Sequence, residues 1–183
     1  MKQINVKEFL SLSLSEQIAY TTILDLCKPK ELLKVKISEL SYNEVKQIFK
    51  QLSKPNCDIE FVFQTALKIS KEDFLKLPIQ NYFQIKKYIE TFFVSLKQNE
   101  IKLLESISAN VGLWEIAGGN ELNEFTDVLP LSQLAKIYGG YPFEYGEKNY
   151  IEIIYLLRMN NKQSQVENEY QKLLANESKN KTR

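Results

Sequence analysis

The chain of 183 residues contains no histidine, only two cysteines, and no spacing typical of a phosphate or metal site. Histidine is the usual general base at neutral pH and the commonest metal ligand, so its absence removes the most frequent routes to catalysis. Neither Cys27 nor Cys57 has a histidine partner, which excludes a cysteine hydrolase of the ordinary form. We therefore expect no enzymatic activity, no cofactor and no bound metal.

An excess of charge of one sign is also missing. The chain carries 24 basic and 23 acidic residues, for a net charge of +1, which provides no long-range field for nucleic acid or anionic lipid. Lys86 and Lys87 lie beside Tyr82 and Tyr88, a pattern that nucleic-acid-binding proteins use, but Glu90 and the overall neutrality favour a solvated helix face. We expect no nucleic-acid partner.

Long apolar runs are absent too. The longest apolar stretches are far shorter than a membrane span, and the N-terminus has neither a long apolar segment nor a signal-peptide cleavage pattern. We therefore expect no membrane association and an intracellular protein. In a reducing compartment the two cysteines would be buried thiols, although a disulfide between them stays open.

The residues that are present favour helices. Apolar residues make up 44% of the chain, enough for a core, and they recur at helical spacing behind residues that cap helix N-termini. Ser13 and Ser41 begin capping boxes, Asp58 and Ser70 suit N-caps, and Pro78 can open the helix that follows. The sequence predicts an all-α, irregular helical bundle with helices over about 13–27, 41–52, 58–67, 70–77, 78–98, 130–138 and 148–175.

The domain organisation follows from the glycines and the polar stretches. We predict an N-terminal helical body over 1–119, a linker over 120–129, a C-terminal helical arm over 130–175 and a disordered tail over 176–183. The pattern near 100–112 fits either a helix or a short β element, and the choice stays open. The pairs Gly118-Gly119 and Gly139-Gly140 have the character of helix stops, because neither follows a strand nor has the third glycine of a nucleotide loop.

Aromatic and apolar residues in the C-terminal part are the candidate protein-binding residues. Tyrosine and tryptophan combine apolar area with a polar group and are enriched in interface hot spots. A thin apolar stripe on the last helix is typical of a contact with one partner helix. The alternative for the aromatic residues is a hydrophobic joint between the two lobes. The candidates are Trp114, Tyr138, Tyr141, Phe143, Tyr145 and Tyr150, with Val166, Tyr170, Leu173 and Leu174 on the stripe.

The acidic residues near the linker are the remaining enzymatic candidate. Glu115 with Glu121, Glu124 or Asp127 is the best acid–base pair that a histidine-free enzyme could build here. No aromatic platform or second acid is spaced to make a dyad, so a solvated turn is the preferred interpretation.

Two stretches carry a resemblance to a known group of proteins. The run TALKISKEDFLKLPIQNYFQI joins two helices through a short turn, and VLPLSQLAKIYGGYPFEYGEKNYIEIIYLLRMNN precedes a long polar helix. This pattern resembles small helical proteins of tailed-bacteriophage morphogenesis, especially tail assembly chaperones and baseplate-hub assembly proteins. The resemblance implies a non-enzymatic factor in the host bacterial cytoplasm that binds a tape-measure or baseplate-hub protein during tail assembly.

Two alternatives to that role stay open. One is a structural virion subunit, such as a baseplate, connector or neck-ring protein, retained in the particle. Another is a host-directed protein that binds and inhibits a bacterial target. A homo-oligomer is compatible with each of them, because the same apolar surfaces can pair with a second copy.

Overall fold

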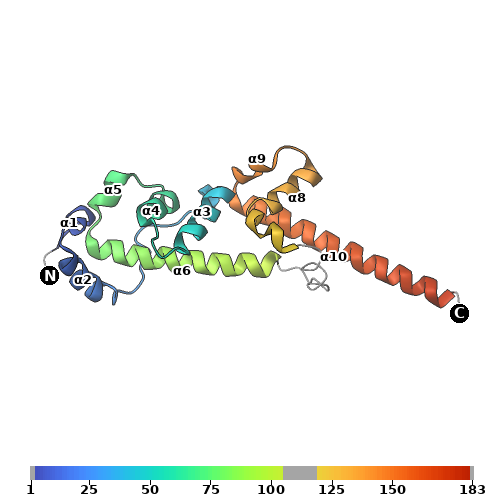
Figure 1. The fold of residues 1–183 in the computed structure, drawn as a ribbon, viewed down its shortest axis with the longest axis horizontal. Helices are drawn as coiled ribbons and strands as arrows, with labels where there is room; N and C mark the ends of the chain where they lie inside the picture. Colours follow the sequence, from blue (N-terminus) through green and yellow to red (C-terminus); the bar gives the residue numbers. More distant parts are fainter. Residues whose placement is uncertain (1–2, 105–118, 182–183) are drawn as a thin grey trace. The chain divides into compact units, whose positions relative to one another are not determined.

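A computed structural model of the chain describes residues 3–104 and 119–181, and Figure 1 labels its helices. The all-α prediction is confirmed: the described residues form helices, and within those two ranges there is no β-strand. The chain divides into two compact units, Met1–Gln98 and Asn99–Arg183. Unit 1 holds α1 (Val6–Leu10), α2 (Leu14–Leu24), η1 (Ile37–Glu39), α3 (Tyr42–Leu52), α4 (Ile59–Leu67), α5 (Lys71–Lys76) and most of α6 (Ile79–Leu104). Unit 2 holds η2 (Gly119–Phe125), α8 (Leu129–Tyr138), α9 (Pro142–Gly146) and α10 (Tyr150–Lys181).

Local capping explains where the helices of unit 1 begin. Ser13 and Ser41 form the predicted capping boxes, and a third box at Asn5 begins α1. In each box the side chain accepts a hydrogen bond from the backbone N–H three residues later, and the glutamate at that position accepts one from the cap N–H. The side chains of Asp58 and Ser70 cap α4 and α5, as predicted, because each also accepts a hydrogen bond from the backbone N–H three residues later. Each cap satisfies a donor that the helix leaves open.

The core of unit 1 is built around aromatic rings. Phe63 is fully buried and lies between two partners, with Tyr82 stacked on it at 5.3 Å and Phe74 edge-on at 5.3 Å. Phe83 meets Tyr82 edge-on at 5.1 Å and Phe9 at 6.1 Å. Edge-on and stacked pairs at these distances stabilise a core beyond the area that they bury. This cluster joins α1, α4, α5 and α6.

The start of the chain is attached to a segment more than seventy positions away. The backbone N–H of Val6 donates to the carbonyl of Leu77 at 2.9 Å, and that of Ile79 donates to the carbonyl of Ile4 at 2.9 Å. Together these bonds form an isolated antiparallel bridge between Asn5 and Pro78. Ile4 and Val6 are buried, so the bridge brings two apolar side chains into the core of the unit.

The observed elements differ from the predicted domains at three places. The two units meet at Gln98–Asn99, within α6, whereas the sequence placed the division at 120–129. The segment predicted as a linker forms η2, a turn and the start of α8. The last helix continues to Lys181, where an end near 175 and a disordered tail over 176–183 were expected. Of the undecided segment near 100–112, the part up to Leu104 is helical and the rest lies outside the described residues.

The physical reason for both helix extensions is the lack of a helix breaker. No glycine or proline occurs between Pro78 and Gly112, and none occurs after Gly146. Polar residues alone do not end a helix, since lysine, glutamine and glutamate have good helix propensity. In the described part of the chain, no helix combines the length and apolarity needed to cross a bilayer.

Candidate protein-binding surface

The turn between α8 and α9 determines which aromatic side chains of unit 2 are exposed. Gly139 and Gly140 both have positive φ, +82° and +84°, a backbone region that L side chains rarely adopt, and they end α8. Pro142 then opens α9, with its fixed φ suited to the first helical position. The carboxylate of Glu144 accepts a hydrogen bond from the Tyr141 N–H at 3.3 Å, which holds the start of this short helix.

Four large apolar side chains project from this turn and the end of α8. Tyr141 is 74% exposed and Phe143 is 69% exposed, and Ile137 and Tyr138 are exposed as well. We call Ile137, Tyr138, Tyr141 and Phe143 the α8–α9 aromatic surface. Helices α8 and α9 pack against each other, so the surface stands on a folded support. Exposed apolar groups gathered in this way mark interaction sites more often than isolated ones do.

Tyr138 also contacts α10. Its hydroxyl donates to the Asn160 side-chain oxygen at 2.9 Å, while the Asn160 amide nitrogen is buried with no hydrogen-bond partner among the described residues. Helix α8 packs on α10 in this region. The aromatic surface is therefore held in place by the long helix and not only by its own turn.

Two of the predicted binding residues belong to the core. Tyr145 is 6% exposed and Tyr150 is 3% exposed, so their assignment to a binding surface was wrong. The Tyr145 hydroxyl donates to the carbonyl of Gly139 at 2.8 Å, and the Tyr150 hydroxyl donates to the Glu100 carboxylate at 2.9 Å. Buried tyrosines need such partners, and both side chains have them. Trp114 lies outside the described residues.

The stripe on α10 is exposed where the sequence placed it. Val166, Tyr170, Leu173 and Leu174 are all exposed. Exposed apolar residues also lie on the first half of the same helix, opposite the buried Ile153, Ile154 and Leu157, and the sequence pattern did not predict them as a binding face. The signal was present, because a helix that is apolar on all sides must either be fully buried or have more than one partner. The additional exposed residues are Ile151, Tyr155 and Met159.

Unit 1 exposes a smaller set that sequence reasoning did not select. On α2 and beside it, Leu14, Ile18 and Leu26 are exposed, although they follow one another at near-helical spacing. A repeat of apolar residues on one helix is normally a core pattern. Here Leu24 is the buried residue of α2, and the pattern alone does not say which face packs.

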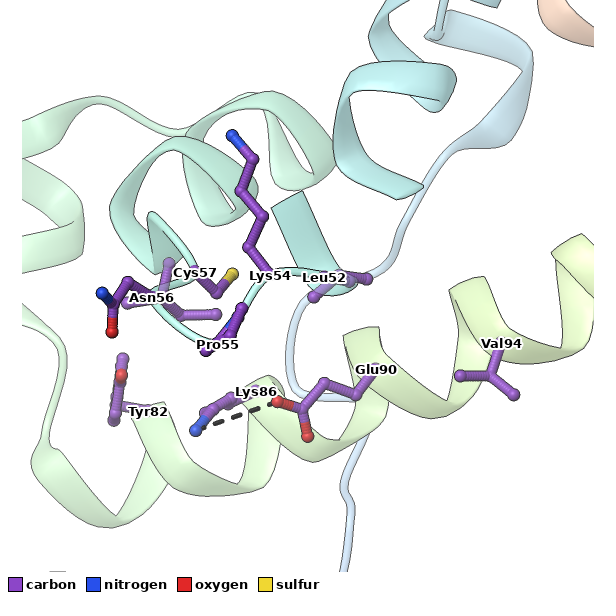
Figure 2. Close-up of a pocket in the computed structure, with 10 residues that line it drawn as sticks. Leu52, Lys54, Pro55, Asn56, Cys57, Tyr82, Lys86, Glu90 and Val94 are labelled. Atoms are coloured by element: carbon purple, nitrogen blue, oxygen red, sulfur yellow. Dashed lines mark ion pairs between the residues drawn. The ribbon is translucent and has the colours of Figure 1, made fainter. Parts of the chain in front are cut away.

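A pocket of about 550 Å³ lies in unit 1 between the loop that precedes α4 and one side of α6 (Figure 2). Pro55, Asn56 and Cys57 come from the loop, and Tyr82 and Glu90 come from α6. Glu90 pairs with Lys86 at 3.8 Å within α6. Burial, aided by the charge of Glu90, raises the pKa of the Cys57 thiol, which disfavours the reactive thiolate. Both cysteines are free thiols.

The phenol of Tyr82 gives a prediction that tests this pocket. Burial, with the charges of Glu90 and Cys57 as smaller causes, raises the pKa of Tyr82 to about 12 from its ordinary value of 10. We expect the Tyr82 phenol to contribute a late component to an alkaline titration followed by phenolate absorbance. That component should be smaller in Tyr82→Phe than in the wild type. A wild-type titration without a late component would contradict the buried position of this phenol.

The same shift predicts how stability changes at high pH. The folded chain holds the Tyr82 proton more tightly than the unfolded chain does, because the folded pKa is the higher one. The Tyr82 proton therefore stabilises the folded state fully below pH 10. As the pH rises from about 10 to about 12, this stabilisation is lost and the free energy of unfolding falls by about 3 kcal/mol. The free energy of unfolding of Tyr82→Phe should fall less over the same pH range.

The charged candidates are the lysines considered for nucleic-acid binding and the acids considered for catalysis, and the lysines have structural contacts. The Lys87 ammonium donates to the carbonyl of Cys27 at 3.1 Å and to that of Asp25, so it holds the end of α2. Lys86 pairs with Glu90 as described above. Glu121, Glu124 and Asp127 are exposed, and their proposed partner Glu115 lies outside the described residues. Among the residues with described positions, no group of three acidic or sulfur ligands is close enough to hold a metal ion.

The α8–α9 aromatic surface and the exposed side of α10 are thus the best-supported candidate sites, and both expose large apolar side chains. Their side chains are the ones that a folded partner could cover. Comparison with known proteins adds no assignment to these sites, since no family model, no curated protein and no solved structure matches this chain.

Proposed function

We propose that this protein is a non-enzymatic assembly factor of a tailed bacteriophage, which binds an apolar helix of a tape-measure or baseplate-hub protein during tail assembly. The observation that carries the proposal is the α8–α9 aromatic surface, where Tyr141 and Phe143 are largely exposed on a folded support. A long tail protein that waits to be built into a tube exposes apolar seams, and a helical partner can cover them.

The charges around the surface favour an apolar partner. Lys136 and Lys148 lie on either side of Glu144 and Glu147 in the sequence, so both signs of charge are present around the turn. A mixed border provides no field of one sign that would select an acidic or a basic ligand. Binding energy here would come mainly from burying aromatic area, with the rim charges setting the orientation.

The resemblance supplies the biological setting. The second of the two stretches that resemble tail assembly chaperones and hub assembly proteins lies on either side of Gly139-Gly140, and it forms α8, α9 and the start of α10. The candidate surface therefore lies within one of the two family-like stretches. This coincidence supports a morphogenesis role over a host-directed one.

Co-expression tests the function directly. The protein is produced together with a candidate tape-measure or baseplate-hub protein of a tailed bacteriophage, and the soluble fraction of that tail protein is measured with and without this chain. We expect the chain to raise the soluble fraction and to co-purify with the tail protein. An unchanged soluble fraction, with no complex on size-exclusion chromatography, would contradict the proposal.

Mass spectrometry of purified particles separates the assembly factor from the virion subunit. An assembly factor is absent from finished particles but is present in the complex with the tail protein before assembly. Detection of this chain at a fixed copy number per particle would replace the chaperone role by a structural one.

A further inference from the structure

The distal half of α10 is exposed on every side. From Lys162 to Glu177 each side chain is exposed, apart from the half-buried Gln165. An isolated helix in water is marginal unless its sequence is rich in alanine, and this one is rich in glutamine, asparagine and glutamate. Side-chain pairs along the helix, such as Gln163 with Glu167 at 2.8 Å, contribute only a few tenths of a kcal/mol each. The apolar stripe is the feature that can supply more stability, once a partner covers it.

The stripe follows a seven-residue repeat. With Met159, Val166 and Leu173 at the d positions, Gln163 and Tyr170 fall at the a positions between them. We call these five residues the dimer seam. The buried residues Ile153, Ile154 and Leu157 fall at other positions of the repeat, on the opposite side of the helix. The fold of unit 2 and a coiled-coil partner would therefore use different faces of α10.

We propose that the occupant of the dimer seam is a second copy of this chain, paired in parallel and in register through the distal half of α10. In a parallel pair, each g residue faces the e residue of the next heptad on the partner helix. Here Lys162 is a g residue and Glu167 is the matching e residue, so the charges are complementary and the pair occurs twice by symmetry. Leu174, also at an e position, flanks the seam and would be partly covered.

The polar member of the seam fixes the orientation. In a parallel, in-register pair Gln163 faces its own copy, and the two amides can hydrogen-bond to each other. An antiparallel pair can also place Lys162 opposite an acidic residue, Glu169. In that register, however, Gln163 faces Val166, so its amide has no partner across the interface and keeps only Glu167 of its own helix. The parallel arrangement satisfies both the charges and the amide.

Sedimentation equilibrium of the full chain tests the proposal, which does not depend on the identity of the tail protein. At about 100 μM we expect a mass of twice 21.4 kDa, falling toward the monomer on dilution. Val166→Glu with Leu173→Glu should be monomeric under the same conditions. The matched control, Ser164→Glu with Gln171→Glu, adds the same charge to the same helix outside the seam and should stay dimeric. A monomeric wild type, or a dimeric seam variant, would overturn the proposal.

Two further variants test the register and orientation. Lys162→Glu should weaken the dimer about tenfold, because it places two acidic side chains opposite each other, and adding Glu167→Lys should restore it. These changes affect only exposed side chains, so they remain informative if the seam variant fails to fold. Gln163→Cys should form an intermolecular disulfide on mild oxidation, which the wild type with Cys27 and Cys57 should not. No cross-link from Gln163→Cys in a dimeric sample would rule out the parallel arrangement.

Discussion

Replacing Tyr141 and Phe143 by serine is expected to weaken binding of the tail protein by about 3 kcal/mol, or roughly a hundredfold. The two side chains are the most exposed aromatic residues of the α8–α9 aromatic surface, so little of their area is used in the fold itself. Removing them should cost binding energy and leave the free energy of unfolding nearly unchanged. Titration calorimetry with the co-purified tail protein, beside thermal unfolding of the isolated chain, measures both quantities.

A matched control separates this surface from general surface hydrophobicity. Leu14→Ser with Ile18→Ser removes two exposed apolar side chains from α2 in unit 1 and should leave binding unchanged. Tyr145 is left intact in the test variant, because its burial and its bond to Gly139 make it part of the fold. Equal loss of binding in both variants would argue against a specific site, and early unfolding of the Tyr141 and Phe143 variant would make these residues structural.

The second large effect concerns the aromatic core of unit 1. Phe63→Ala is expected to lower the free energy of unfolding by about 3–5 kcal/mol, which is the usual loss when a buried phenylalanine leaves a cavity. The ring is fully buried and touches both Phe74 and Tyr82, so neither of these side chains can fill the cavity without losing its own contacts. Urea unfolding followed by circular dichroism measures the change.

The comparison for this prediction is an exposed phenylalanine in the other unit. Phe143→Ala removes the same group from a site that is largely in solvent, and the stability should change by less than about 0.5 kcal/mol. If the two variants unfolded at the same urea concentration, the aromatic cluster around Phe63 could not be the main core of unit 1.

The helix starts could be predicted because capping is a local property. Ser13, Ser41, Asp58 and Ser70 each bond to a backbone group three residues ahead, so the whole interaction lies within one short window of sequence. No long-range information is needed to recognise it. The cap at Asn5 was missed because its box precedes a helix of only five residues and leaves no clear apolar repeat to mark it.

The candidate site could be predicted only in part, because exposure depends on contacts far apart in the sequence. Tyr141 and Tyr145 are four residues apart and chemically identical, yet one is exposed and the other is buried against the backbone that precedes α9. The partner of Tyr150 is Glu100, fifty residues earlier. Periodicity can indicate that a residue is apolar and helical. It cannot say which of two apolar faces on α10 the rest of unit 2 will cover.

The antiparallel bridge between Asn5 and Pro78 has a consequence for the timing of folding during synthesis. A ribosome makes the N-terminal residues first, at about 5–20 residues per second, so Ile4 and Val6 exist for several seconds before Leu77 and Ile79 are available to them. During that interval α3, α4 and α5 can pair with their immediate neighbours, since those contacts are short in sequence. The segment that holds Ile4 and Val6 is therefore synthesised before the rest of unit 1 but is among its last parts to reach the native position.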